Sequence, residues 1–445
     1  MYSIKLSLKL STINNTMSSD NEVKITEVET VFQLVENIKN KPMLKVQLGH
    51  NTDIGGSRVN QDRHSVLTFP EHDVYAIAVA DGHSHETGHH IADITKNCLE
   101  NLLKNRITEL IENPVTFLEF CCDYIHEEIR KELVKKMERE GYKIYVDGAG
   151  VISKVKSGRE IYEDVKGGTT FSIVILIGKK LYIANLGDST GLLCCKTPIL
   201  KPSNIKYEKD AANPTKVISS CDIDSSLSTY IELTREHSPE NVEEYIRMRD
   251  FKCSDENANH AELLCVYDDQ HNSCKYTCPH VFNISETGTP TVREDAAYKY
   301  YYKNLRKEKA TYVCERYSNS VLSITRALGD YKFQNLGVTN KPEIQSIDLE
   351  PIFQQIDTAK VEKVDPMTVC VVLCSDGVWD NWQYDDVCKF VMDPSCLNAI
   401  AHDEEKGAER VAESFMLRNN LFATRNFGNS ADNATGIIMY ITQEE

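Results

Sequence analysis

The sequence predicts a single α/β sandwich in which strands form the centre and helices flank them. Three short, strongly apolar runs have the length of buried strands, namely Val74–Ala80, Thr169–Ile177 and Thr368–Cys374. Between Pro114 and Gly141, apolar residues recur at steps of three or four, which is typical of a helix that buries one face. Because strands dominate the middle of the chain, a sandwich fits this order better than alternating parallel strand–helix units.

The remaining elements complete this sandwich. We expect a first strand at Met43–Leu48 and a hairpin that joins Thr169–Ile177 to Leu181–Leu186. Near the end of the chain, Glu405–Leu421 predicts a helix and Thr435–Ile441 predicts a closing strand.

Two parts of the chain depart from this pattern. Residues 1–42 are polar and poor in aromatic residues, and we expect them to be a poorly ordered N-terminal extension. Residues 43–442 form the predicted domain, within which Asp210–Ser320 is less regular and suggests an inserted subdomain. That stretch is rich in charges and its cysteines include Cys253, Cys265, Cys274, Cys278 and Cys314.

Charge and hydropathy exclude several classes of function. The formal net charge of −17 argues against nucleic-acid binding, which needs a basic surface. No run approaches the roughly 18 apolar residues of a membrane helix, and Met1–Met17 lacks the apolar centre of a signal peptide. We therefore expect neither nucleic acid nor membrane as a partner, and we interpret the fifteen cysteines as reduced thiols.

Three turns that contain aspartate lie next to apolar strands. They are Asp81-Gly82-His83, Asp376-Gly377 and Asp432-Asn433. Any one of them alone is better explained as an ordinary turn. If they converge, they form an oxygen-only site of the kind that selects hard cations such as Mg²⁺ or Mn²⁺.

The turns belong to a longer series of motifs. The chain resembles the metal-dependent protein serine/threonine phosphatases of the type 2C family in eight segments, which follow the family's order and span nearly the whole chain from about residue 43. Each segment alone is a loose pattern, but eight in sequence are highly specific. The segments are Asn60-Gln61-Asp62-Arg63, VADGH (Val79–His83), GGTT (Gly167–Thr170), ANLGDS (Ala184–Ser189), LTREHSP (Leu233–Pro239), LSITRALGD (Leu322–Asp330), CSDGVWD (Cys374–Asp380) and DNATGII (Asp432–Ile438).

The resemblance implies two packed β-sheets flanked by helices on both faces, with two Mg²⁺ or Mn²⁺ ions at one end. It implies that Asp81 bridges the two ions and that the carbonyl of Gly82 contacts one of them. Asp376 and Asp432 are then expected to hold the other ion, with Asp62 in the ligand shell or just behind it.

A third, weaker ion is a further implication. Asp164 falls where some family members place a carboxylate for such an ion, shared with Asp376. The alternative is that Asp164 is a solvated loop acid, and the sequence leaves both interpretations open.

The expected chemistry follows from the ions. Two cations that share a carboxylate lower the pKa of a bridging water, so hydroxide is available near neutral pH. In-line attack on phosphorus would hydrolyse phosphoserine and phosphothreonine in protein substrates. We expect His83 to protonate the leaving oxygen as general acid and Arg58 to bind the phosphoryl group. The expected enzyme is a monomer of the cytoplasm, the nucleus or both.

The sequence departs from the family pattern around this site. Gln61 stands where family members often have Glu, which removes one charge near an ion. The phosphate-binding arginine is expected at the position of Ser57, and Arg58 lies one residue further along. The glycines that usually follow DGH are replaced by Ser84-His85, and His85 and His89 have the i, i+4 spacing of a helical zinc site, although ordinary surface histidines are the better interpretation.

The interval at about 240–320 is the other departure. In the family it carries the flap beside the active site, so an enlarged flap here would influence substrate choice. The spacing Cys274-x3-Cys278-x-His280 invites a zinc hypothesis, but it lacks the C-x₂-C of common zinc modules, and unpaired thiols fit better.

The main alternative is a catalytically weak relative that acts as a binding or regulatory protein. Such a protein would be expected to lose one of the three turn aspartates. All three are present together with His83, which favours the enzyme.

Overall fold

The computed structural model describes residues 44–443, apart from gaps at 157, 159–160, 201–205, 211–226, 252–260, 267–276, 295–298, 316–318 and 360–366. The predicted N-terminal extension, residues 1–42, lies outside the described residues. Leu44–Thr442 form one compact unit. Within the described part of the chain, none of the helices has the length and apolar character that crossing a membrane requires.

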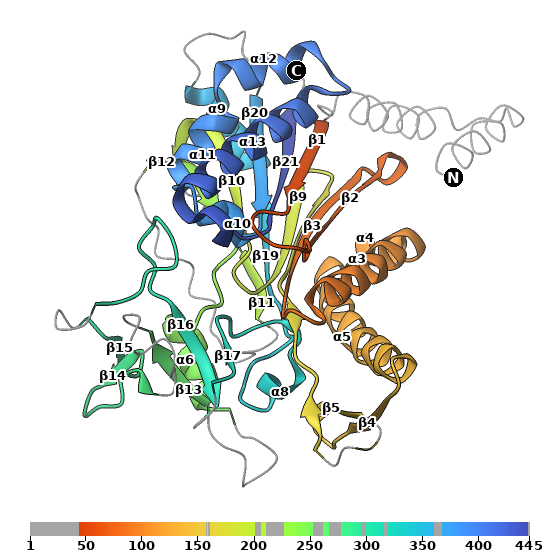
Figure 1. The fold of residues 1–445 in the computed structure, drawn as a ribbon. Helices are drawn as coiled ribbons and strands as arrows, with labels where there is room; N and C mark the ends of the chain where they lie inside the picture. Colours follow the sequence, from red (N-terminus) through yellow and green to blue (C-terminus); the bar gives the residue numbers. More distant parts are fainter. Residues whose placement is uncertain are drawn as a thin grey trace, which may run out of the picture. The chain divides into compact units, whose positions relative to one another are not determined.

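Two β-sheets form the centre of this unit (Figure 1). The smaller sheet has five strands in the order β1 (Leu44–Asp53), β21 (Ala434–Gln443), β20 (Met367–Cys374), β10 (Thr190–Leu200) and β12 (Leu227–Glu232). The larger sheet has eight strands, of which β2 (Asp62–Phe69) pairs only with β3. The others follow the order β11 (Lys206–Asp210), β19 (Glu343–Asp348), β9 (Lys180–Leu186), β8 (Phe171–Ile177), β3 (Val74–His83), β7 (Gly168–Thr169) and β18 (Leu328–Gly329).

The apolar runs are continuous because the strands are buried on both faces. In β3, Ile77 and Val79 belong to the core between the two sheets, whereas Ala76 and Ala78 belong to the core under the helices. Successive side chains of a strand point to opposite faces, so such a strand needs apolar residues at every position.

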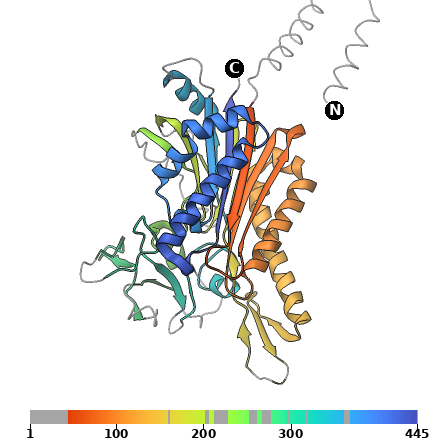
Figure 2. The same ribbon diagram turned by 45° about the horizontal axis from the view of Figure 1, so that its top comes forward.

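Helices cover both outer faces (Figure 2). The larger sheet packs against α3 (Gly88–Asn105), α4 (Ile107–Glu112) and α5 (Pro114–Arg139). The smaller sheet packs against α10 (Asp376–Trp379), α11 (Tyr384–Val391), α12 (Pro394–His402) and α13 (Gly407–Phe427). The residues of α9 (Glu350–Ala359) join the core between the sheets. The layers are therefore α-β-β-α, as predicted.

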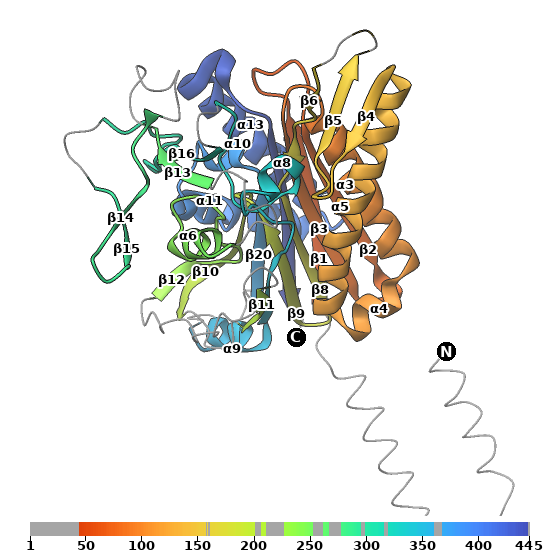
Figure 3. The same ribbon diagram turned by 90° about the horizontal axis from the view of Figure 1, so that it is seen from below.

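Smaller elements gather at one end of the sheets (Figure 3). One group comprises α6 (Val242–Arg249), the sheet β13-β16-β17 and the hairpin β14-β15; the strand bounds are Ala261–Cys265, Thr311–Glu315, Val321–Leu322, Phe282–Ile284 and Pro290–Val292. The other group comprises α8 (Tyr331–Gln334) and the sheet of β4 (Tyr142–Val146), β5 (Ile152–Lys156) and β6 (Glu163–Asp164).

The expected elements occur close to their predicted bounds. The helix predicted from Pro114 is α5, and the apolar stripe along it is buried. The helix predicted at Glu405–Leu421 is α13, which begins at Gly407 and continues to Phe427.

Candidate functional site

Five acidic side chains lie at the same end of the two sheets because strand ends converge there. Asp62 begins β2 and pairs in register with Asp81, near the end of β3. Asp188 lies in the turn that connects β9 of the larger sheet to β10 of the smaller one. Next to β10, strand β20 leads into Asp376, and Asp432 lies two residues before Ala434, the first residue of β21.

The electrostatics of these acids show that they are neighbours. Burial raises the pKa of Asp81 well above its usual value, and the charges of Asp62, Asp376 and Asp432 raise it further. Burial and then the charge of Asp188 likewise raise the pKa of Asp376 well above its usual value. Carboxylates that repel one another in this way are stabilised by any cation placed among them.

Asp432 and Asp380 extend the cluster. Protein atoms displace water from the carboxyl group of Asp432 although the residue lies at the surface, and this raises its pKa, as does the charge of Asp188. Burial raises the pKa of Asp380 to about 7, although Lys303 and Arg306 oppose the shift. We refer to Asp62, Asp81, Asp188, Asp376, Asp380 and Asp432 as the acid cluster.

Asp62 is the most deeply buried member, with 3% of its surface exposed. Its Oδ2 accepts a hydrogen bond of 2.7 Å from the hydroxyl of Ser375, which in turn accepts one from the N–H of Thr435. Its Oδ1 is buried with no hydrogen-bond partner among the described residues. Burial raises the pKa of Asp62 to about 6. An orphaned carboxylate oxygen beside other acids fits a cation ligand or its close support.

The chemistry of these donors fits Mg²⁺ or Mn²⁺, which prefer carboxylate and carbonyl oxygens. Among the described residues, no three His, Cys, Asp or Glu side chains are already grouped tightly enough to hold a metal ion. The case for a metal site therefore depends on the buried, mutually repelling carboxylates. Gly82 is close to them: its N–H donates to the carbonyl of Gln61 at 3.3 Å, and it pairs with Thr169 in the sheet.

His83 lies two residues after Asp81 and contacts Asp330, an acid outside the acid cluster. Its Nε2 lies 2.6 Å from Oδ2 of Asp330, a residue that is 5% exposed. Burial alone would lower the pKa of His83, but the carboxylate of Asp330 reverses this effect and raises it. Gly168 leaves room for that carboxylate, since a Cβ there would lie 2.1 Å from Asp330 Oδ2. Asp330 thereby orients the imidazole and favours its protonated form.

The loop between β1 and β2 carries Arg58 and packs against the residues around Asp432. A Cβ on Gly55 would lie 2.1 Å from the carbonyl oxygen of Asp432, and the φ of Gly55 is +61°, so glycine permits this close approach. The side chain of Asn433 donates to the carbonyl of Ile54 at 2.7 Å. Arg58 is exposed on this loop.

Gln61 has a supporting part in the structure. Its backbone N–H donates to Oδ1 of Asn433 at 2.7 Å, and its side-chain amide donates to the carbonyl of Ser84 at 2.6 Å. The amide therefore ties the β1–β2 loop to the turn that follows His83. A glutamate in this position could not donate that bond.

Asp188 is the acid that sequence reasoning missed, although it lies within the ANLGDS motif. The structure gives Asp164 other neighbours: it lies in the separate sheet β4-β5-β6, where its carboxylate is 3.0 Å from Nζ of Lys332 and accepts a bond from Ser153. Asp188 instead raises the pKa of Asp81 and of Asp376.

The two zinc hypotheses have different outcomes. His85 is exposed and precedes α3, which begins at Gly88. His85 and His89 therefore do not lie on the same helix, and their i, i+4 spacing does not place them on one helical face. Cys274 lies outside the described residues. Cys278 is buried, whereas His280 pairs with Leu264 as an isolated bridge.

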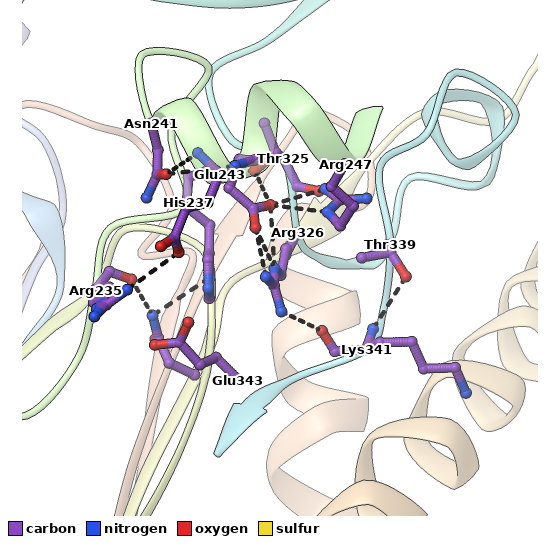
Figure 4. Close-up of polar contacts among 12 residues, drawn as sticks. Arg235, His237, Asn241, Glu243, Arg247, Thr325, Arg326, Thr339, Lys341 and Glu343 are labelled. Atoms are coloured by element: carbon purple, nitrogen blue, oxygen red, sulfur yellow. Dashed lines mark hydrogen bonds and ion pairs between the residues drawn. The ribbon is translucent and has the colours of Figure 1, made fainter. Parts of the chain in front are cut away.

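The turn that carries Asp188 is hydrogen-bonded to His237, which belongs to a network of polar contacts that also includes Thr325 (Figure 4). His237, from the LTREHSP motif, accepts a 3.2 Å bond from the N–H of Gly187 and donates its own N–H to the carbonyl of Gly187. The backbone N–H of Thr325 donates to the carbonyl of His237 at 2.8 Å. The hydroxyl of Thr325 donates to the carboxylate of Glu244 at 2.7 Å. These contacts connect the turn to α6 and to the LSITRALGD motif.

Arg326 and Arg247 both donate hydrogen bonds to the carboxylate of Glu244. Their Nη2 atoms lie 2.5 Å and 2.8 Å from it, and all three side chains are at least nine-tenths buried. Burial alone would raise the pKa of Glu244, but the two guanidinium groups hold it well below its usual value.

Solved structures with a similar fold include protein phosphatases. A serine-threonine phosphatase 2C from Toxoplasma gondii is 16% identical, covers 90% of this chain and 98% of its own, and has a TM-score of 0.46. A sex-determining protein of C. elegans is 15% identical, with 96% and 75% covered and a TM-score of 0.46. The catalytic domain of the serine threonine protein phosphatase PstP, in complex with 2 manganese ions, is 14% identical, with 90% and 99% covered and a TM-score of 0.39.

Comparison with protein families identifies the chain. No curated protein sequence matches it. The family model of protein phosphatase 2C matches residues 60–215 and 306–418, which leaves residues 216–305 between the two matched segments. The matched segments contain Asp62, Asp81, Asp188 and Asp376. Since the match covers more than half of the chain, the chain belongs to the protein phosphatase 2C family.

Proposed function

We propose that the chain is an active, metal-dependent phosphatase that hydrolyses phosphoserine and phosphothreonine in proteins. The observation that carries this proposal is the convergence of buried carboxylates, with raised pKa values, at one end of both sheets. Burying several acids together without matching cations is unfavourable. A binding site for divalent cations explains why a folded protein keeps such a cluster.

The residues then have distinct parts. Asp81, Asp376 and Asp432 would hold two Mg²⁺ or Mn²⁺ ions, with Asp62 in or behind the ligand shell and Asp188 as an additional acid. When bound, such ions make hydroxide available from water near neutral pH and offset negative charge on the phosphoryl oxygens.

His83 would act on the leaving group. Asp330 engages its Nε2 and raises its pKa, which favours the protonated ring that would give a proton to the serine or threonine oxygen. Arg58, from the loop beside Asp432, would contact the phosphoryl group of the substrate.

The test is hydrolysis of an aryl phosphate and of a phosphothreonine peptide with Mn²⁺, with Mg²⁺ and with EDTA. We expect turnover that disappears in EDTA and falls more than about 100-fold in Asp376→Asn, beyond the range seen when outer-shell partners of a metal are changed. Asp386→Asn, an exposed acid of α11, is the matched control and should keep full activity.

The opposite outcome is equally clear. A folded native chain that is silent with both metals would contradict the proposal and favour a binding or regulatory protein. The loss of charge at Gln61 and the displaced Arg58 would then be the first features to restore by mutation.

A further inference from the structure

A lysine from outside the family match lies at the edge of the acid cluster. Lys303 falls within residues 216–305, between the two matched segments. Its Nζ is 2.5 Å from Oε1 of Glu236, 3.7 Å from Oε2 of Glu308 and 3.9 Å from Oδ2 of Asp188. One ammonium group therefore lies among three carboxylates, and one of these belongs to the acid cluster.

The backbone around Lys303 holds this position. Its N–H donates to the carbonyl of Glu308 at 2.9 Å, which closes a short hairpin. Inside the hairpin, Oδ1 of Asn304 accepts bonds from the N–H groups of Arg306 and Glu308 at 3.0 Å and 3.2 Å. Asn304 is 8% exposed and lies at the centre of the hairpin, whereas Leu305 at its tip is 51% exposed.

The same hairpin is hydrogen-bonded to the C-terminal end of α10, the helix that begins at Asp376. The N–H of Leu305 donates to the carbonyl of Asp380 at 3.3 Å, and Nη1 of Arg306 donates to the carbonyl of Trp379, the last residue of α10. The guanidinium of Arg306 also lies over the ring of Tyr384, 5.1 Å from its centroid. The hairpin thus joins the turn of Asp188 to the helix that begins at Asp376.

Asp188 and Asp376 are the pair that this lysine is placed to affect. Thr190 of β10 pairs in register with Cys374 of β20, so Asp188 and Asp376, each two residues beyond this pair, lie at the same end of two neighbouring strands. Two adjacent carboxylates are natural ligands for one more divalent ion. An ammonium group close to one of them competes with that ion, because like charges repel strongly in a partly buried site.

We propose that the ammonium of Lys303 is a resident cation of the acid cluster, which neutralises Asp188 and keeps a further divalent ion from binding between Asp188 and Asp376. This inference rests on the proposed metal-dependent function, since it concerns how many ions that site takes. Lys303 is a positioning residue: it acts on Asp188 and not on the substrate.

A purely structural part for Lys303 makes a different prediction. If the lysine only holds the hairpin through Glu236, its removal lowers stability and leaves the number of bound ions unchanged. The count of ions therefore separates the two explanations, and it does not depend on catalytic turnover.

The experiment counts Mn²⁺ per chain by isothermal titration calorimetry and equilibrium dialysis of the full-length protein. Lys303→Met is combined with Glu236→Gln, because removing both members of this partly buried ion pair is better tolerated than removing one. The matched control combines Lys309→Met with Glu294→Gln, another lysine–glutamate pair of the same region, whose atoms are 2.6 Å apart. Thermal unfolding checks that each variant is folded.

We expect one additional Mn²⁺ per chain in the Lys303→Met/Glu236→Gln variant and none in the control. Adding Asp188→Asn should remove the additional ion. An unchanged count and affinity in the folded Lys303 variant would overturn the proposal, as would an additional ion that survives Asp188→Asn. The count for the wild-type chain decides the proposed function separately, since a wild-type chain that binds no Mn²⁺ contradicts that function whatever the variants do.

Discussion

Buried acids at two places in this protein have opposite neighbours: one acid lies against arginines and the others lie beside further acids. Glu244 is 2% exposed and lies against Arg326 and Arg247, which hold its pKa well below the usual value. Asp62 is 3% exposed and lies beside other carboxylates, and burial raises its pKa to about 6. The two acids are buried to the same extent, so the difference comes from their neighbours.

The comparison teaches how to separate a structural acid from an acid that awaits a ligand. A buried carboxylate with matched cations is complete within the chain and holds elements together, here α6 and the LSITRALGD motif. A group of carboxylates that repel one another, with one lysine of the chain at its edge, is completed mainly from outside, by protons or by metal ions. Removing the structural acid should therefore lower the stability of the protein, whereas removing a charge from the acid cluster should raise its stability when metals are absent.

The largest effect is expected on the structural side. Glu244→Ala leaves Arg326 and Arg247 buried without their counter-charge, and breaking a buried ion pair in this way costs about 3–5 kcal/mol. Urea unfolding at pH 7 measures the loss. Glu243→Ala is the control: Glu243 is half-exposed and its pair with Arg235 at 3.1 Å is expected to contribute less than about 1 kcal/mol.

The pH dependence of Glu244 has a defined sign. A carboxyl group whose pKa is depressed by folding stabilises the folded state above its unfolded pKa, and this contribution is lost as the pH falls toward the folded pKa. The stability of the native chain should therefore fall below about pH 4.5, and the Glu244→Ala variant should lack that part of the decline. An identical acid limb in both proteins would contradict the ion-pair assignment.

The acid cluster should show the opposite pH dependence when metals are removed. Because folding raises the pKa of Asp62 from 3.8 to about 6, the folded state holds more protons than the unfolded state between these values. Stability in EDTA should consequently decrease as the pH rises through this window, by about 3 kcal/mol for Asp62 alone. Unfolding in EDTA at pH 5 and pH 7.5 samples the upper part of this window, where a decrease of about 1.4 kcal/mol is expected.

Asp62→Asn sharpens this prediction. Without the charge, the variant should be more stable than the native chain in EDTA at pH 7.5, and Mn²⁺ should stabilise it less. If the variant is instead less stable in EDTA, the structural role of the bond between Asp62 and Ser375 outweighs the repulsion, and the contrast with Glu244 fails.

An intermediate effect is expected at His83, where an acid is matched by a titratable partner. A general acid accelerates a reaction on the order of 10²–10⁴-fold. Asp330→Asn keeps His83 but removes the carboxylate that orients it and raises its pKa, so this variant should lower kcat on the order of 10- to 100-fold. The alkaline limb of the rate profile should move to lower pH, because Asp330 no longer raises the pKa of His83.

A double variant controls this experiment. In a His83→Ala background, Asp330→Asn should have little further effect on kcat, since the two residues act as a unit. Additive losses would show that Asp330 works independently of His83.

The smallest effect is expected at Asp164. Its charge is already matched by Lys332 at 3.0 Å, so Asp164→Asn should leave the Mn²⁺ affinity within about twofold of the native value. Asp376→Asn, in contrast, changes a proposed metal ligand and should weaken Mn²⁺ binding more than about 100-fold. Titration with Mn²⁺ compares the two, and equal effects would place Asp164 in the cluster after all.

The sequence by itself determined the layers of the fold and the turns that carry three of the acids. Continuous apolar runs of strand length predict strands buried on both faces, and Val74–Ala80 and Thr368–Cys374 are such strands, β3 and β20. Asp81 and Asp376 lie at the ends of these strands, and they are predicted as metal ligands because the motifs around them resemble those of the type 2C family. These are local properties of the chain.

The tertiary structure decided which charges meet. Asp164 and Asp188 look alike in the sequence, and only the paths of β6 and β9 give one of them Lys332 and bring the other to Asp376. Lys303 lies more than a hundred residues from Asp188, and their 3.9 Å contact depends on a hairpin docked on α10. The electrostatic energy of a charge depends on distances of a few ångströms between residues far apart in the chain, and no local pattern encodes those distances.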